Sequence, residues 1–368
     1  MKLLYVQHVD WKWIPQRPHF LARQMIDLGH QLDVAYIAGW RSSGNVVVDP
    51  ALALPASPKK LYGLPRWATP VVRAIDARLL EWQLRPMITK DHDAIWVTHP
   101  RVFAGLRQIA GLPPIIYDCM DDAEALEPRG KNYVSVVDQQ LFKSSRVVIS
   151  SSPKLDAKAG SRARQGTCRL VVGNGCRGDY PWPVMRNDGT GVRSHDGADR
   201  PADQRPTQAL FYGTIGGWLD IEVLLALAEA PGVELRLVGP VRTSLPESLA
   251  ACCHEPMGHT QLLQFAERWA DWLVLPFRKD EFSETVDPVK LHEYVGLGHP
   301  ILAPELEVLR PADRFLAMYR SPAHAVEITT SPALVRASHQ ERQEYILSRT
   351  WAARALEIDL ALAEVFSS

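Results

Sequence analysis

The fold of this chain is indicated best by one stretch, Asp287-Pro288-Val289-Lys290-Leu291-His292-Glu293-Tyr294-Val295-Gly296-Leu297-Gly298-His299-Pro300-Ile301-Leu302-Ala303. Asp287 is a favoured N-cap type, Pro288 suits the first position of a helix, and Gly298 suits a helix C-cap. The apolar residues after His299 are typical of a buried strand. The stretch therefore predicts a helix that begins just after a polar loop and leads into a strand.

The first turn of this predicted helix is a candidate anion site. Lys290 would add its charge to the unpaired backbone N–H groups and the positive end of the helix dipole, which together suit a diphosphate. Glu293 lies three residues further, on the same face, where its carboxylate can accept hydrogen bonds from a sugar diol. A capped amphipathic helix with a solvated lysine and glutamate explains the same pattern.

The stretch resembles the nucleotide-sugar-binding signature of GT-B glycosyltransferases, in particular the teichuronic-acid and exopolysaccharide types. The resemblance implies an α/β fold of two Rossmann-like, doubly wound parallel-sheet domains that face an interdomain cleft. It also implies that Glu293 binds the donor ribose. Many retaining members have a second glutamate eight residues earlier, where this chain has Thr285, with Glu284 beside it. This incomplete pattern slightly favours inverting chemistry.

Length and composition set limits on the function. At 368 residues the chain exceeds the usual size of a single core, so two domains are expected. A formal net charge of -1 gives no reason to expect a nucleic-acid partner. The cysteines are odd in number and lack C-x-x-C spacing, so neither a disulfide framework nor a zinc site is expected. They are Cys119, Cys168, Cys176, Cys252 and Cys253.

The sequence also bears on location. The N-terminus turns polar too soon for a signal peptide, and no apolar run reaches the ~18 residues of a spanning helix. We therefore expect a cytoplasmic protein, with peripheral contact at the inner face of the cell membrane as an option. Between Lys59 and Lys90 the cations outnumber the acids, and Trp67 and Trp82 are interleaved, which suits an anionic membrane. An ordinary amphipathic helical hairpin is the alternative interpretation of this segment.

Short apolar runs alternate with helix-like stretches, which is typical of parallel sheets covered by helices. The expected strands are 3–7, 32–37, 94–98, 115–118, 147–150, 170–172, 210–212, 234–238, 272–275 and 301–303, and the expected helices include 18–28, 221–230, 261–269 and 288–297. We predict an acceptor-binding domain (1–180), a linker or mobile loop (181–206), a donor-binding domain (207–338) and a C-terminal helix (339–368). In GT-B enzymes such a last helix commonly crosses back to the first domain.

Two loops of the second domain are candidates for donor contacts. In Phe211-Tyr212-Gly213-Thr214-Ile215-Gly216-Gly217-Trp218, glycines after a strand let the backbone approach a phosphate. This loop resembles the Tyr-Phe-Gly-x-Ile-x-x-Trp pattern of the same family and makes Gly213 and Thr214 candidates, although a plain turn fits too. Arg278, after a later strand, can bind a diphosphate or simply pair with Asp280 or Glu281.

The first domain has an unusually aromatic and ionisable loop, His8-Val9-Asp10-Trp11-Lys12-Trp13-Ile14-Pro15-Gln16-Arg17-Pro18-His19. Part of it resembles a family motif that faces the cleft. Trp11 and Trp13 can stack on sugar rings and Arg17 can bind an acceptor phosphate. In the other interpretation, the tryptophans pack beneath the loop.

A candidate general base ends another strand, Ile115-Ile116-Tyr117-Asp118-Cys119-Met120-Asp121-Asp122. Like charges raise one another's pKa, which suits a base. The stretch is similar to the motif that supplies the catalytic aspartate of inverting GT-B transferases, and alignment on Tyr117 gives that role to Asp121. Helix capping by Asp121 or Asp122 is the alternative. Other candidates for the base are His8, Asp10 and His99.

No metal and no cofactor are expected. Asp91-His92-Asp93 matches the D-x-D of metal-dependent transferases, but it precedes a strand instead of following one. The resemblance implies a metal-independent hexosyltransferase that moves a sugar from a UDP- or GDP-type donor to a saccharide or lipid-linked saccharide, in bacterial surface polysaccharide synthesis. An epimerase of the same fold and a non-catalytic nucleotide-binding scaffold of an assembly complex stay open as alternatives.

Overall fold

The computed structural model describes residues 1–12, 15–38, 54, 56–64, 69–127, 130–185, 205–331 and 337–367. The chain divides into two compact units, each with a parallel sheet and a core of its own. The first unit comprises Met1–Gly175, Thr285–Asp287 and Trp351–Ser368, and the second comprises Cys176–Glu284 and Pro288–Thr350. Of the predicted linker, residues 186–204 lie outside the described part.

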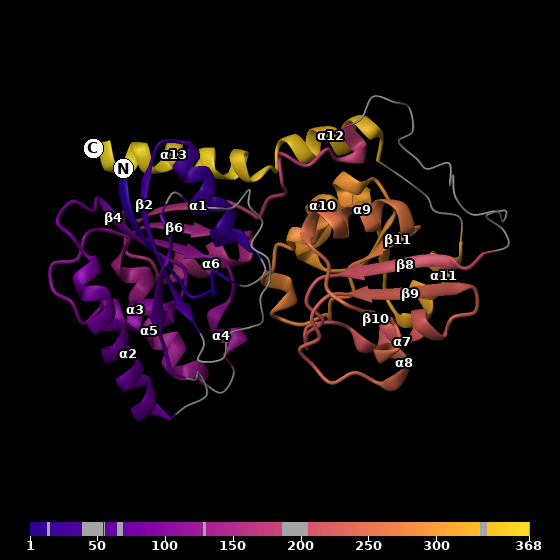
Figure 1. Cartoon of the computed structure of the whole chain (residues 1–368), viewed down its shortest axis with the longest axis horizontal. Coiled ribbons are helices and arrows are strands. Elements are labelled where there is room, and N and C mark those ends of the chain that lie inside the picture. Colours follow the sequence, from indigo (N-terminus) through magenta and orange to yellow (C-terminus); the bar gives the residue numbers. More distant parts are fainter. Residues whose placement is uncertain are drawn as a thin grey trace. The chain divides into compact units, whose positions relative to one another are not determined.

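The described residues of the first unit form a seven-stranded sheet in the order β3-β2-β1-β4-β5-β6-β7 (Figure 1). Its strands are β1 (Lys2–Gln7), β2 (Gln31–Ala38), β3 (Lys59–Tyr62), β4 (Ala94–Val97), β5 (Ile115–Cys119), β6 (Ser145–Ser150) and β7 (Cys168–Val171). All the pairings between them are parallel. The strand order reverses between β1 and β4, so the carboxyl ends of these strands mark the usual ligand-binding position of such sheets.

Helices cover both faces of this sheet (Figure 1). They are α1 (Arg17–Asp27), α2 (Pro70–Leu84), η2 (Arg85–Met87), α3 (Pro100–Leu106), α4 (Ala123–Leu126), α5 (Lys131–Ser144), α6 (Pro153–Arg162) and α13 (Trp351–Ser367). One face packs against α2, α3 and α5 through a cluster that includes Leu80, Phe103 and Leu141. On the other face α1 meets α13, where the Phe20 and Trp351 rings stack with centroids 5.0 Å apart.

The second unit repeats this plan, with the described strand order β10-β9-β8-β11-β12-β13. Its strands are β8 (Thr207–Tyr212), β9 (Val233–Val238), β10 (Cys253–His254), β11 (Trp272–Val274), β12 (Ile301–Pro304) and β13 (Leu316–Tyr319). Its helices are η4 (Pro183–Met185), α7 (Ile221–Glu229), α8 (Glu247–Ala250), α9 (His259–Trp269), α10 (Val289–Leu297), η7 (Glu307–Phe315), α11 (Pro322–Thr330) and α12 (His339–Leu347), and a short turn, η6 (Ser283–Thr285), precedes α10. The predicted class of two doubly wound parallel-sheet domains is confirmed.

Three local predictions were wrong. Strand β3 lies inside the segment predicted as a helical hairpin, because only Leu61 of its four residues is buried and gives no clear alternation. Helix α10 begins at Val289 with Pro288 at the N-cap, and Asp287 instead accepts a hydrogen bond from the backbone N–H of Asn174. The predicted C-terminal helix is two helices, because the Arg349 carbonyl between α12 and α13 accepts from the backbone of Cys176 at 2.8 Å.

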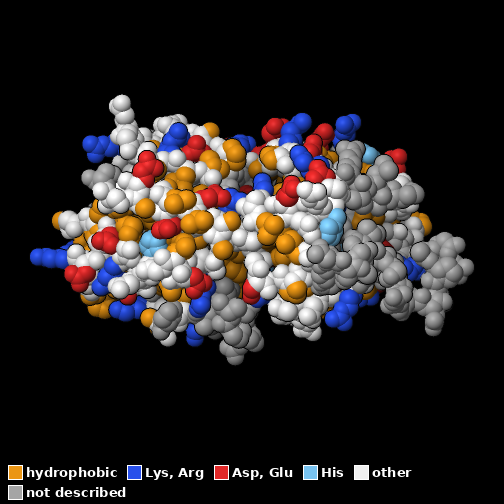
Figure 2. Space-filling model, turned by 90° about the horizontal axis from the view of Figure 1, so that it is seen from above, with side chains coloured by type: hydrophobic (Ala, Val, Ile, Leu, Met, Phe, Trp, Pro, Cys, Tyr) orange, Lys and Arg blue, Asp and Glu red, His pale blue; other side chains and the backbone are white. Residues whose placement is uncertain are grey.

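On the side shown in Figure 2, acidic and basic side chains are interspersed with apolar ones, and no large patch carries charges of only one sign. Within the described residues, no helix is both long and apolar enough to span a bilayer.

Candidate functional site

In the second unit the loops after β8 and β11 are joined by backbone hydrogen bonds. Arg278 N donates to Trp218 O at 3.0 Å, and Asp220 N donates to Pro276 O at 2.7 Å. Because β8 and β11 flank the reversal of strand order, these loops lie at the carboxyl-end position where such sheets bind ligands. Together with the first two turns of α10 they form what we call the rim site, which comprises Gly213, Thr214, Arg278, Lys290 and Glu293.

Lys290 lies against the backbone of Gly213. The φ of Gly213 is +123°, and a Cβ atom there would overlap Cε of Lys290. The Lys290 ammonium has no hydrogen bond or ion pair with any described residue, and its nearest aromatic ring is Phe211, with the centroid 5.8 Å away. Burial lowers the pKa of this ammonium, and the Glu293 charge opposes that shift. An unpaired, half-buried cation at a helix N-terminus is an arrangement that favours an anion.

Glu293 is held by two side chains. The Tyr212 hydroxyl donates to Oε2 at 2.9 Å, and His259 Nε2 lies 2.7 Å from Oε1. Burial by itself would raise the pKa of Glu293, but the charge and hydrogen bond of His259, the Tyr212 hydroxyl and Lys290 outweigh it and lower the pKa. Sequence reasoning missed His259 as a partner, because it begins a different helix and no local spacing relates it to Glu293.

Arg278 is exposed and forms an ion pair with Asp280 at 2.8 Å. In this conformation Arg278 therefore forms the surface charge pair that the sequence offered as the alternative to a diphosphate contact. The backbone of Arg278 joins its loop to the β8 loop, and contact of its guanidinium with a diphosphate stays a prediction.

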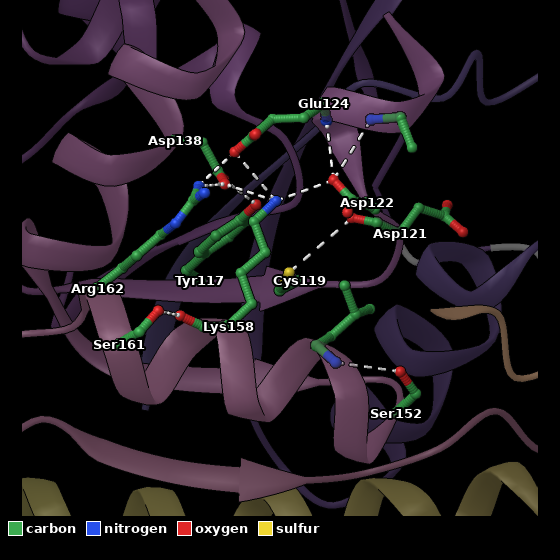
Figure 3. A network of polar contacts seen from close by, with 12 residues as sticks. Tyr117, Cys119, Asp121, Asp122, Glu124, Asp138, Ser152, Lys158, Ser161 and Arg162 are labelled. Carbon is green, nitrogen blue, oxygen red and sulfur yellow. Dashed lines mark hydrogen bonds and ion pairs between the residues drawn. The ribbon is translucent and has the colours of Figure 1, made fainter. Parts of the chain in front are cut away.

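In the first unit, Asp121 follows β5, and its carboxylate points away from Lys158 and Arg162 (Figure 3). The Asp121 backbone carbonyl accepts from Cys119 Sγ at 3.9 Å, but the carboxylate has no hydrogen bond or ion pair with any described residue. Burial raises the pKa of Asp121 to about 7, with Arg17 opposing the shift and Asp118 and Asp122 adding to it. The sequence had suggested crowded carboxylates as the cause, whereas burial is the larger one. A carboxylate with such a pKa suits a base at neutral pH.

Asp122, the next residue, belongs to a network of ion pairs (Figure 3). Its Oδ1 caps α4 by accepting from Glu124 N at 3.0 Å and also accepts from Lys158 Nζ at 2.9 Å. The network continues from Lys158 and Arg162 to the buried Asp138, whose Oδ1 accepts from the Tyr117 hydroxyl. The capping interpretation thus applies to Asp122 and not to Asp121.

The other candidates for the base occupy the carboxyl ends of β1 and β4. The His8 and His99 rings lie 4.5 Å apart, and His8 Nδ1 is 3.0 Å from Thr98 Oγ1. His99 Nδ1 accepts from Arg101 N at the start of α3, so a neutral His99 carries its proton on Nε2. Asp10 accepts from the backbone of Lys12 at 3.0 Å.

The predicted acceptor residues are mostly enclosed. Trp11 is buried and packs on His19 with ring centroids 4.4 Å apart, as the packing interpretation expected. Arg17 is buried too, with its Nε 3.0 Å from Asp118 Oδ1 and its Nη1 donating to the Gly173 carbonyl. Trp13 lies outside the described residues. Acceptor contact by these side chains stays a prediction.

No protein-family model and no curated protein matches this chain. Solved structures do match it. Sucrose-phosphate synthase from Thermosynechococcus elongatus superposes with a TM-score of 0.72 at 14% identity over 100% of both chains. Anabaena HepE, in complex with UDP and glucose, gives 0.69 at 12% identity over 99% of this chain and 100% of that one. The lipopolysaccharide outer core galactosyltransferase WaaB gives 0.62 at 11% identity over 99% of both. At these identities the likeness concerns architecture, and the architecture is the GT-B glycosyltransferase fold.

Proposed function

We propose that this chain is a glycosyltransferase that uses a nucleotide-diphosphate sugar as its donor. The proposal rests on the position of Lys290. Its ammonium is unpaired among the described residues and lies at the start of α10 against Gly213. A diphosphate at this point would gain the ammonium and the free N–H groups of the first helical turn. Glu293, one turn further, would accept from the ribose hydroxyls. The UDP in the HepE structure supports this class of donor.

The reaction that we propose is an inverting transfer. For inverting transfer, an acceptor hydroxyl attacks the anomeric carbon of the donor sugar while the bond to the diphosphate oxygen breaks. The bonding electron pair leaves with the diphosphate, whose charge Lys290 and the helix N-terminus stabilise. Asp121 takes the hydroxyl proton. Its pKa of about 7 supports this role.

Calorimetry with UDP and GDP, with and without EDTA, tests the donor site. We expect at least one nucleotide to bind in either buffer. Lys290→Ala should weaken binding roughly 10- to 100-fold, the loss of about 1.5–3 kcal/mol for a charge-assisted contact. The matched control is Lys279→Ala, because Lys279 is exposed on the neighbouring loop. Equal affinities for the two variants would exclude Lys290 from the site, and binding that disappears with EDTA would contradict a metal-free pocket.

Product analysis separates the proposal from its two rivals. A transferase leaves the donor sugar intact or slowly hydrolysed until an acceptor is added. Conversion of the donor to its epimer without an acceptor would establish the epimerase, and nucleotide binding without turnover over a broad acceptor panel would establish the scaffold.

The acceptor we propose is a saccharide or lipid-linked saccharide of a bacterial surface polysaccharide, reached at an anionic membrane through α2. The solvent-facing side of α2 carries Val71, Ile75 and Trp82, which are 66%, 53% and 75% exposed. The acids of this helix, Asp76 and Glu81, are buried and ion-paired. Apolar side chains flanked by cations suit anionic headgroups. Arg78 and Arg85 pair with Glu81, whereas Lys59, Lys60 and Lys90 are exposed and have no ion pair with any described residue.

Vesicle sedimentation tests this surface. The chain should pellet with vesicles that contain phosphatidylglycerol and not with pure phosphatidylcholine. Ile75→Asp with Trp82→Asp should abolish pelleting, whereas Leu360→Asp, on the exposed side of α13, should not. Pelleting that is the same in all three proteins would contradict a role for α2.

A further inference from the structure

The carboxylate of Glu293 is fixed in orientation before any ligand arrives. Tyr212 holds one oxygen and His259 the other, at 2.9 Å and 2.7 Å. Tyr212 is itself fixed, because it is buried at the end of β8 and packs edge-on against Tyr294 with ring centroids 5.0 Å apart. A carboxylate with a partner on each oxygen cannot rotate without breaking a hydrogen bond, so its plane is set by these two side chains.

The two partners leave Glu293 with unused hydrogen-bonding capacity. Each carboxylate oxygen can accept two hydrogen bonds, and each has one from the partners described above. One further acceptor position therefore stays on each oxygen, which matches the two adjacent hydroxyls of a ribose. The Glu293 side chain is 8% exposed and the His259 side chain 24% exposed, so His259 forms the accessible side of the pair.

We propose that His259 is a positioning residue for the donor, one that holds the Glu293 carboxylate in the plane that accepts both ribose hydroxyls and thereby selects ribonucleotides over 2′-deoxyribonucleotides. This inference rests on the proposed donor site. It adds a residue from α9 to a site that the sequence placed on α10 and on the loops after β8 and β11.

The electrostatics of the pair agree with this role. Burial alone would favour the protonated form of Glu293, but His259, Tyr212 and Lys290 together lower its pKa and keep the carboxylate. His259 also contributes to the lowered pKa of Asp179, after the larger effect of Arg177. Loss of the imidazole would free one oxygen of Glu293 while leaving the bond from Tyr212.

The test compares UDP with 2′-deoxy-UDP, and GDP with 2′-deoxy-GDP in parallel, by calorimetry on the full chain. The wild type should bind the ribonucleotide on the order of tenfold more tightly. His259→Ala should weaken binding of the ribonucleotide by a similar factor and barely change binding of the deoxynucleotide. The ratio of the two affinities should therefore approach one. His259→Gln, whose amide N–H can donate to the same oxygen, should keep most of the preference. His254→Ala, at an exposed histidine near the start of α9, should bind as the wild type does.

The outcomes are distinct. If His259→Ala keeps the wild-type preference, or weakens both nucleotides equally, the positioning role is overturned while the donor site stands. If the wild type binds no nucleotide, both the proposed function and this inference are contradicted. Thermal unfolding of each variant excludes misfolding, and His259→Gln supplies the comparison if the alanine variant does not fold.

Discussion

Adjacent aspartates at the end of β5 have opposite environments. Burial opposes ionisation of Asp122, but Lys158 and the α4 backbone outweigh it and lower the pKa. Asp121 has no such partner among the described residues, and burial raises its pKa to about 7. Environments that push two neighbouring carboxyl pKa values apart are typical of sites where one group does proton transfer and the other holds structure.

The first prediction assigns the base. Asp121→Asn keeps the shape of the side chain but removes its basicity, so turnover should fall by a factor on the order of 10²–10⁴ while nucleotide binding persists. In the wild type, kcat/KM should rise with pH with an apparent pKa near 7, because only ionised Asp121 accepts a proton. Asp122→Asn should reduce turnover much less. The reverse order would shift the role to Asp122, and no effect from either would direct attention to His8, Asp10 and His99.

Stability gives an independent measurement of the same residue. The folded pKa of Asp121 exceeds the unfolded value of 3.8, so the native state retains a proton that the unfolded chain releases between about pH 4 and 7. Its contribution to stability therefore declines as pH rises through that window. At pH 8, Asp121→Asn should increase the free energy of unfolding by roughly 1–3 kcal/mol in urea titrations. A decrease would mean that the carboxylate has a stabilising partner.

Gly213 provides the next prediction. Gly213→Ala adds a side chain at φ +123°, a strained conformation for alanine, and displaces Lys290. Nucleotide affinity should fall at least about tenfold, which corresponds to roughly 1.4 kcal/mol. Gly217→Ala in the same loop is the control, because nothing lies within 4 Å of its added Cβ. Similar losses in both variants would indicate that the loop, and not the Lys290 contact, is responsible.

At the scale of elements, α6 stabilises the region around the base. Lys158 and Arg162 of this helix pair with Asp122, Glu124 and the buried Asp138, which links α6 to α4 and α5 (Figure 3). The Asp121 loop lies between β5 and α4, so its geometry depends on these pairs.

Removing one cation tests this dependence. Lys158→Met should leave Asp138 undercompensated and lower the free energy of unfolding by roughly 3–5 kcal/mol, the usual result of breaking a buried pair. Lys154→Met on the same helix should change it little, because Lys154 is exposed. Denaturant unfolding at pH 7 makes the comparison. A small effect of Lys158→Met would mean that Arg162 alone compensates the acids.

Much of this arrangement of elements could be predicted from the sequence, for physical reasons. Central strands such as β1 and β5 are buried on both faces and appear as continuous apolar runs, and Gly298 ends α10 with φ +82° as its residue type suggested. The edge strand β3 has one buried residue and no such signal. The His259–Glu293 contact joins residues far apart in the chain, and the burial that raises the pKa of Asp121 is a tertiary property. Neither could be read from local spacing.

At the scale of the whole molecule, α13 completes the first unit from the far end of the chain. Trp351 is buried and stacks on Phe20, and Asp359 lies 2.8 Å from His30. Trp351→Ala should destabilise the first unit by about 3–5 kcal/mol, whereas Leu360→Ala, at an exposed position of the same helix, should be nearly neutral. Scanning calorimetry should show the loss in one transition of two, since two-domain chains need not unfold in one step. A loss confined to the transition that UDP or GDP stabilises would contradict the assignment of α13.

The membership of α13 in the first unit has a consequence for synthesis on the ribosome. Residues 176–350 are translated after the main body of that unit and before its last helix. At roughly 5–20 residues per second this takes about 10–30 s. During that time the apolar surface of α1 that includes Phe20 stays exposed in the nascent chain. A chaperone that binds apolar segments could therefore bind α1 until α13 has been translated.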